Sequence, residues 1–218
     1  MKKFLGCLMA VAGAMLIYGC QQKNPTACHI VGTVNGEQYE GKRIFLVPLF
    51  GPSTAEYVDS VEIKDGKFEF FPDSVKMYKI LMDYHYRFGL QQLIVLGEPG
   101  EIKVVIDSIS SASGTPQNDS LQMWKEHTEK HHMQYGFINK GIAALKAKGD
   151  TIQAAALKQQ ADSLYLAYKN YTRQLAKNLN EGPLHDFLEG LYPLTYKRKM
   201  PDGRIVTMNA DTHEEIKE

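Results

Sequence analysis

The chain has 218 residues, of which 25 are basic and 25 are acidic, and 44% are hydrophobic. This length is sufficient for one or two domains with their own hydrophobic cores. The balanced charge, and the absence of a basic patch interleaved with aromatic residues, argue against a nucleic-acid-binding protein. After the first twenty residues, no apolar run is long enough to span a bilayer.

The first nineteen residues have the pattern of a secretory signal peptide. Lys2 and Lys3 are followed by the apolar run from Phe4 to Tyr18 and by a small residue, Gly19. A basic start, a short apolar core and a small residue at the cleavage position are typical of such signals. We therefore expect residues 1–19 to be removed.

The last residues of this segment, Ile17-Tyr18-Gly19-Cys20, resemble the lipobox of bacterial lipoproteins. The resemblance implies that Cys20 becomes the first mature residue and carries acyl chains, with residues 20–27 as a lipidated tether. Two or three acyl chains give stable anchoring, which one chain does not. The implied location is the cell envelope, lipid-anchored at the outer membrane or a periplasm-facing membrane. The alternatives are an ordinary cleaved signal or a single-span anchor.

The chain contains three cysteines and no Cys-x-x-Cys motif. Cys7 lies in the signal peptide and Cys20 in the lipobox, so Cys28 is left without an internal disulfide partner. Two interpretations remain open for Cys28: a buried thiol at the start of a strand, or a reactive or intermolecular thiol.

Residues 28–112 show the short apolar runs and turn residues of an all-β domain. No helical period interrupts them, so we expect a small antiparallel β-sandwich. The expected strands are Cys28–Val34, Arg43–Leu49, Tyr57–Ile63, Lys67–Phe71, Met77–Tyr84, Gln92–Leu96 and Glu101–Ile106.

Asp65-Gly66 is the strongest hairpin signal in the chain. A two-residue loop would pair Lys64 with Lys67 and continue outward along both strands. The further pairs expected from this register are Ile63 with Phe68, Glu62 with Glu69, and Val61 with Phe70.

Residues 108–118 are rich in Ser, Gly, Thr and Pro, which predicts a linker. Residues 117–180 then change to a heptad period, which predicts an antiparallel two-helix hairpin. Gly149 would end the first helix, and Asp150 would cap the second, with Gln153 completing a capping box. Six seam residues are expected to be largely buried: Trp124, Ile138, Ile142, Leu157, Leu164 and Leu175.

Residues 181–218 predict a short C-terminal α/β segment. Gly182-Pro183 ends the hairpin, and a short helix is expected at Leu184–Leu191. Two strands, Tyr196–Lys199 and Arg204–Met208, would form a last hairpin around Asp202-Gly203. The whole chain is therefore expected to have an α+β fold.

Several segments of the strand region also occur together in a known family. They include Val31–Gly36, Gly41–Leu46, Val58–Phe70, Gly97–Ile102 and Ser113–Asn118. This ordered set resembles the N-terminal domain of unknown function, family number 4369 (DUF4369), of Bacteroides-type lipoproteins, over roughly residues 28–125.

In the fuller members of that family, a helical segment and a thioredoxin-like domain of the disulfide-reductase type follow. The Cys-x-x-Cys of that domain is absent here, so the resemblance assigns redox chemistry to no residue of this chain. It implies an envelope location, the sandwich and the helical segment.

Two residue clusters are candidates for a metal site or a ligand site. His127, Glu129, His131 and His132 do not have the zincin or inverzincin spacing, and His131 falls on the helical seam, so no metal site is expected. Tyr84, His85, Tyr86 and Phe88 form an aromatic cluster at a strand end, which is either a ligand patch or a cover of the sandwich core.

These observations predict a non-catalytic binding or interaction lipoprotein that uses no cofactor. Its expected partners are the membrane, reached through acylated Cys20, and a protein of the envelope; a small-molecule ligand stays unknown. The alternative is an accessory to a separate thioredoxin-like thiol-disulfide oxidoreductase, with Cys28 as its thiol.

Overall fold

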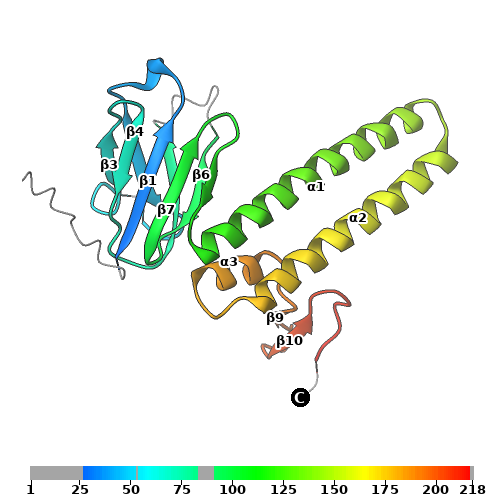
Figure 1. Ribbon diagram of the computed structural model, residues 1–218. Coiled ribbons are helices and arrows are strands. Elements are labelled where there is room, and N and C mark those ends of the chain that lie inside the picture. The colour runs from blue at the N-terminus through cyan, green and yellow to red at the C-terminus, as the bar shows by residue number, and fades with distance from the viewer. Residues whose placement is uncertain (1–26, 53, 83–90, 217–218) are drawn as a thin grey trace, which may run out of the picture.

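The computed structural model describes residues 27–52, 54–82 and 91–216. It shows an α+β protein in which a β-sandwich is followed by a helical hairpin and a short C-terminal segment (Figure 1). The predicted order of these parts is confirmed. Cys20 and the aromatic cluster Tyr84, His85, Tyr86 and Phe88 lie outside the described residues.

The sandwich consists of two four-stranded sheets whose facing side chains form its core. The first sheet has the order β4-β1-β7-β8 and the second β3-β2-β5-β6. The strands are β1 (Cys28–Val34), β2 (Arg43–Pro48), β3 (Asp59–Glu62), β4 (Lys67–Phe70), β5 (Met77–Met82), β6 (Leu93–Leu96), β7 (Gly100–Ile106) and β8 (Ser111–Ser113). A short 3-10 helix, η1 (Glu37–Tyr39), connects β1 to β2.

One strand pair departs from the antiparallel pattern that the sequence predicted. β1 and β7 run parallel, with Cys28 opposite Gly100 and Val34 opposite Ile106. The other strand pairs of the two sheets are antiparallel. Alternation of apolar residues marks the buried face of a strand but carries no information about the direction of its neighbour, so this pair could not be predicted.

The Asp65-Gly66 turn forms, but it joins two different sheets. Lys64 and Lys67 pair as predicted, and Asp65 and Gly66 both have positive φ angles. The carboxylate of Glu40 accepts hydrogen bonds from both backbone N–H groups of the turn, at 2.8 and 3.0 Å.

The predicted pairs beyond Lys64–Lys67 are wrong. β3 pairs with β2, and β4 pairs with β1, so Phe68 lies opposite Gly32 and Glu69 opposite Val31. A β-carbon at Gly32 would lie 1.9 Å from the Phe68 ring, so only glycine leaves room for this aromatic side chain. Because the chain crosses between sheets at the turn, both strands still direct their apolar residues into the core.

The predicted linker is also wrong. Ser111–Ser113 form β8, which pairs with β7, and α1 begins at Pro116. Ser110 is buried and its hydroxyl donates to the backbone carbonyl of Gln91 at 2.7 Å. Small polar residues are typical of linkers and of edge strands alike, so composition alone did not distinguish the two.

The helical hairpin consists of α1 (Pro116–Ala147) and α2 (Thr151–Asn178), as predicted. Gly149 has a φ of +78° at the turn. The Asp150 carboxylate accepts a hydrogen bond from the Gln153 N–H at 3.0 Å. The backbone N–H of Asp150 donates instead to Leu145 O, so the expected second half of the capping box is replaced by a backbone contact.

The burial expected for the seam is only partly correct. Trp124 is buried, whereas Ile138, Ile142, Leu157, Leu164 and Leu175 are half-buried. The hairpin projects away from the sandwich, and Figure 1 shows only its base beside the other elements. Two helices alone cover each seam side chain from one side, so a heptad pattern overestimates burial where no third layer is present.

The C-terminal segment packs at the base of the hairpin. It comprises α3 (Pro183–Leu191) and the strands β9 (Thr195–Lys199) and β10 (Ile205–Asn209), close to the predicted elements. Leu184 and Leu188 of α3 join Trp124 and Leu96 in a second core at the junction of sandwich, hairpin and α3. The Arg173 guanidinium donates to Asp211 and to the carbonyls of Tyr192 and Pro193, which fixes this segment to α2.

Candidate functional site

The start of α1 is attached to the sandwich by two buried polar side chains. The Asn118 side chain donates to Leu96 O at 2.8 Å and accepts from Leu96 N at 2.9 Å. The Glu98 carboxylate accepts from the backbone N–H groups of Gln117 and Asn118, at 3.0 and 3.2 Å. A carboxylate at a helix N-terminus satisfies donors that have no partner within the helix. Together, these contacts set where α1 leaves the sandwich.

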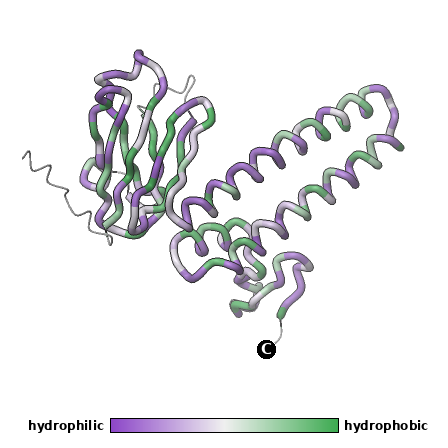
Figure 2. Tube along the Cα trace, in the orientation of Figure 1, coloured by the Kyte–Doolittle hydropathy of each residue, from purple (hydrophilic) through white to green (hydrophobic). Residues whose placement is uncertain are grey.

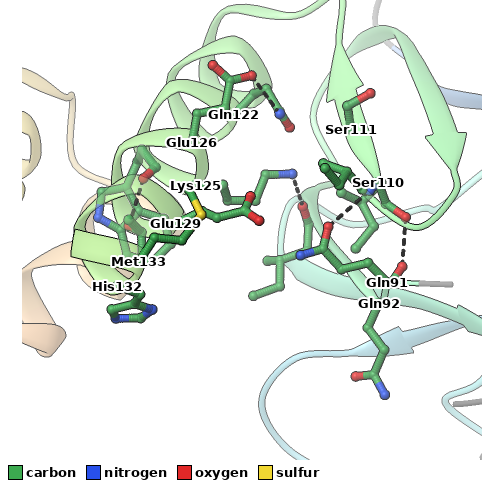
Figure 3. Close-up of a pocket in the computed structure, with 15 residues that line it drawn as sticks. Gln91, Gln92, Ser110, Ser111, Gln122, Lys125, Glu126, Glu129, His132 and Met133 are labelled. Carbon is green, nitrogen blue, oxygen red and sulfur yellow. Dashed lines mark hydrogen bonds between the residues drawn. The ribbon is translucent and has the colours of Figure 1, made fainter. Parts of the chain in front are cut away.

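A groove of about 560 Å³ lies between this first part of α1 and the rim of the sandwich. One wall is the exposed side of α1, and the other comes from β6 and the segments around residues 91 and 110 (Figure 3). Its polar lining residues are Gln91, Gln92, Ser110, Ser111, Gln122, Lys125, Glu126, Thr128, Glu129 and His132, and its apolar ones are Leu93, Ile94, Ile109, Trp124 and Met133.

Lys125 crosses the groove from α1 to the sandwich. Its Nζ lies 3.4 Å from the backbone carbonyl oxygen of Ile94, and Figure 3 shows the side chain reaching across the gap. Burial lowers the pKa of Lys125 to about 8, and the nearby Glu126 carboxylate opposes part of this shift. The ammonium group of Lys125 is the main positive charge at this wall, and it can donate hydrogen bonds to a ligand.

Other polar side chains of the groove hold its walls in place. The Gln91 side chain accepts from Ser110 N at 3.0 Å. The Gln122 side chain accepts from Ala112 N at 3.2 Å and donates to Glu126 at 2.9 Å. These bonds connect α1 to β8 and position the walls, whereas Gln92, Glu129 and His132 complete the polar lining. The chemistry offered is hydrogen bonding and charge, which suits binding.

A stack of histidine and tyrosine rings fills the proximal half of the hairpin seam. The His131 ring lies 4.2 Å from that of Tyr168 at an angle of 10°, and the His127 ring lies 3.9 Å from that of Tyr171. His131 therefore lies within the seam, as predicted. Its Nδ1 is buried and has no hydrogen-bond partner within the described part of the chain. Burial and the neighbouring His132 and His127 lower the pKa of His131.

The structure brings His127, His131 and His132 near one another on α1 but not into the arrangement of a metal centre. Among residues 27–52, 54–82 and 91–216, no group of three or more His, Cys, Asp or Glu side chains could hold a metal ion. Stacking on tyrosines occupies the imidazole faces of His127 and His131 instead.

Cys28 is buried at the first position of β1, with a free thiol. Burial raises the pKa of this thiol, an effect that the Glu98 carboxylate reinforces and a hydrogen bond to the Glu98 backbone opposes. A raised pKa reduces the thiolate fraction, and the thiolate is the reactive form. This environment corresponds to the first of the two interpretations, a buried thiol at the start of a strand.

The groove was not predicted from the sequence. Its α1 residues Lys125, Glu126 and Glu129 resemble the solvated face of an amphipathic helix, and Ser110 was assigned to a linker. The groove exists because α1 packs beside the edge strands of both sheets, β6 of one and β8 of the other. The spacing of Lys125 and Glu129 beside the buried Trp124 was the only local sign.

The molecule is thus a β-sandwich with a projecting helical hairpin and a polar groove where the two meet. Residues 28–121 match the model of the family described as "Domain of unknown function (DUF4369)", which confirms the predicted resemblance. No curated protein and no solved structure matches the chain. In the described part, no helix is both long and apolar enough to cross a membrane.

Proposed function

We propose that this protein is a non-catalytic binding or interaction lipoprotein of the bacterial cell envelope, anchored to a membrane through acylated Cys20. The signal-like start and the lipobox-like residues 17–20 support the anchor. The DUF4369 match supports the same setting, because the sequence resemblance is to the front domain of Bacteroides-type lipoproteins.

The observation that carries the binding role is the incompletely covered helical hairpin. α1 has 32 residues, which corresponds to a helix about 48 Å long. Among the described residues, its far half lies beside α2 alone (Figure 1), and the large seam residues there, Ile138, Ile142 and Leu157, remain half-buried. Phe137 is 80% exposed on α1 and Ile152 is 83% exposed on α2. A contiguous exposed apolar patch marks a protein-contact surface, and the proposal takes Phe137 and Ile152 as part of such a patch.

The proposed partner is another protein of the envelope, which packs apolar side chains against this far half of the hairpin. A long projecting element can reach a partner without moving the anchored sandwich. The groove at the base, with the Lys125 ammonium, would then provide a second, polar contact. Apolar contacts at the centre and polar contacts at the rim are the usual composition of protein interfaces.

The alternative, a redox accessory, has less support. It depends on Cys28, the one cysteine within the sandwich, and burial raises the pKa of its thiol. A direct assay separates the two roles: the mature protein should not accelerate reduction of insulin disulfides. Turnover that Cys28→Ser abolishes would instead favour the redox role.

The partner is best identified by placing a photo-reactive residue at Phe137 in the full-length protein in cells. The captured protein is then purified and its affinity measured with defined variants. Phe137→Ser and Ile152→Ser should each weaken binding about tenfold or more, since burial of a large apolar side chain contributes about 1.5–3 kcal/mol. Ile205→Ser is the matched control, because Ile205 is 69% exposed on β10, which lies at the base of the hairpin and not at its far half (Figure 1). Equal affinity of the Phe137→Ser variant would refute the hairpin as the contact surface.

A further inference from the structure

The N-terminal tether and a set of exposed apolar side chains lie at the same end of the sandwich. β1 begins there, and the strand register places Gly100 beside Cys28 and Phe70 beside Ile30. In the second sheet, Pro48 lies beside Tyr78 and Leu96 beside Met77. Two connections, residues 71–76 and 97–99, join the two sheets at this end.

Two neighbouring depressions at this end carry exposed apolar side chains. A shallow depression is lined by Ala27 together with Phe71, Val75 and Pro99. Phe71 is 66% exposed and Val75 is 52% exposed. Phe50, two residues beyond β2, is 64% exposed and lines the neighbouring depression, whose other wall is α3 with Phe187. We call Phe50, Phe71 and Val75 the tether-end patch.

The length of the chain before Ala27 decides what this patch faces. Six residues lie between Cys20 and Ala27, and the seven steps from one to the other can span at most about 25 Å. β1 has seven residues, so the opposite end of the sandwich is about 23 Å further away. If Cys20 carries acyl chains, the patch is the part of the sandwich held nearest the bilayer.

The chemistry of the patch suits the lipid interface. Aromatic and aliphatic side chains partition into the boundary between head groups and acyl chains. The Phe71 ring is stacked on His29 at 4.6 Å, which holds it in a fixed exposed position. The opposite end of the sandwich instead carries Lys42, Lys64, Asp65 and Lys67 around its turns.

We propose that the tether-end patch rests on the phospholipid bilayer to which the chain is anchored, so that the membrane contacts Phe50, Phe71 and Val75 directly. This inference depends on the anchoring proposed for Cys20. A weak apolar contact is sufficient, because the tether makes the second contact intramolecular and raises its effective concentration. The charged residues that line the two depressions are Lys76 and the carboxylates Asp73, Glu98 and Asp186, so the contact does not depend on attraction to anionic lipid.

The contact can be tested without relying on natural acylation. The chain from Cys20 onward, with Cys28→Ala, is coupled through the Cys20 thiol to a maleimide lipid in phosphatidylcholine vesicles that contain brominated acyl chains. Phe71→Trp and Ile109→Trp are the two probes, since Ile109 is 65% exposed and follows the end of β7, at the opposite end of the sandwich. The parent, which contains only the buried Trp124, provides the baseline.

The tryptophan introduced at position 71 should lose emission intensity to the brominated chains, and its emission should shift to shorter wavelength. After the emission of Trp124 in the parent is subtracted, the tryptophan introduced at position 109 should show neither change. Phe50→Ser with Val75→Ser should reduce the quenching at position 71, and added anionic lipid should leave it unchanged. Equal quenching at 71 and 109, no quenching at either, or quenching at 71 only with anionic lipid would each overturn the proposal. Absence of acyl chains on the natural protein would refute the anchor instead, so the two failures are distinguishable.

Discussion

The side-chain amide of Asn118 pairs with the backbone of Leu96 as a neighbouring strand would, donating at 2.8 Å and accepting at 2.9 Å. A residue of the first turn of α1 thereby extends the hydrogen bonding of β6 at its end. The groove and the direction of the hairpin depend on this attachment together with the contacts of Glu98, Gln122 and Lys125, which also join the start of α1 to the sandwich. Among the described residues, the far half of the hairpin lies away from the sandwich (Figure 1).

Replacing Asn118 with Ala should therefore destabilise the protein strongly. The change leaves the buried N–H and C=O of Leu96 without these partners, and each unsatisfied group costs about 1–3 kcal/mol. We expect the free energy of unfolding to fall by about 2–5 kcal/mol in chemical denaturation. Asn139→Ala, at an exposed position of the same helix, is the control and should be nearly neutral. A loss below 1 kcal/mol for Asn118→Ala would mean that the attachment is not a main stabilising contact.

The second core, at the junction with α3, and the seam of the hairpin should respond differently to leucine truncation. Leu188 is fully buried among sandwich, hairpin and α3, and Leu188→Ala should cost about 2–5 kcal/mol. Leu164 is half-buried in the seam, so Leu164→Ala should cost only about 1–2 kcal/mol. Equal losses in urea titrations would show that the hairpin has further cover in solution.

The ring stack predicts a dependence of stability on pH. The pKa of His131 is lowered in the folded protein, so its unfolded form takes up a proton first as the pH falls below about 6.5. Stability should be unaffected by this residue above that pH and should decrease below it, until the folded pKa is reached. The charged or titratable neighbours are His127, His132 and Tyr135 on α1 and Tyr168 on α2.

His131→Phe preserves a flat ring against Tyr168 and removes the proton. The difference in unfolding free energy between the two proteins should be constant above pH 7 and should shift in favour of the variant between pH 6.5 and 5. Denaturant titrations across this range measure it. A difference that does not change with pH would contradict a neutral, buried His131.

Lys125 should be the amine that gives up its proton at unusually low pH. Its pKa is lowered to about 8, whereas that of Lys158, paired with Asp162, is raised. Competitive labelling with an acylating reagent, read by mass spectrometry across pH 7–11, should show a midpoint near 8 for Lys125. Lys158 is the internal control and should titrate above the ordinary lysine range. A midpoint for Lys125 equal to that of Lys158 would rule out the partly buried amine at the groove.

Local patterns were sufficient to predict the elements other than β8 and the short helix η1. Period-two runs located β1 and β4, the heptad period located both long helices, and Gly149-Asp150 located their turn. These signals depend on neighbours close in sequence, where backbone geometry fixes which side chains share a face. Hydropathy along the chain follows the same alternation in the strands and on the hairpin (Figure 2).

Long-range relations were not predicted. The parallel pairing of β1 with β7 joins residues more than seventy positions apart. The separation of β3 from β4 into different sheets likewise depends on how the sheets pack. The groove arises from these relations, since Gln91, Ser110 and Lys125 come from three different segments. For the hairpin, the prediction was wrong in the opposite direction. The regular heptad seam predicted fully buried side chains, but two helices alone cover the seam from one side, and full burial requires a third layer of structure.

The central claim, an envelope lipoprotein that presents this fold from a membrane, is tested most directly at Cys20. The protein is expressed from its full-length gene in a bacterium, recovered from the membrane fraction, and its N-terminal peptide is measured by mass spectrometry. The account predicts that the chain begins at Cys20 and carries two or three acyl chains, and that Cys20→Ala gives an unprocessed or released protein. An N-terminus elsewhere, or an unmodified Cys20 with unchanged membrane association in the Cys20→Ala variant, would contradict it.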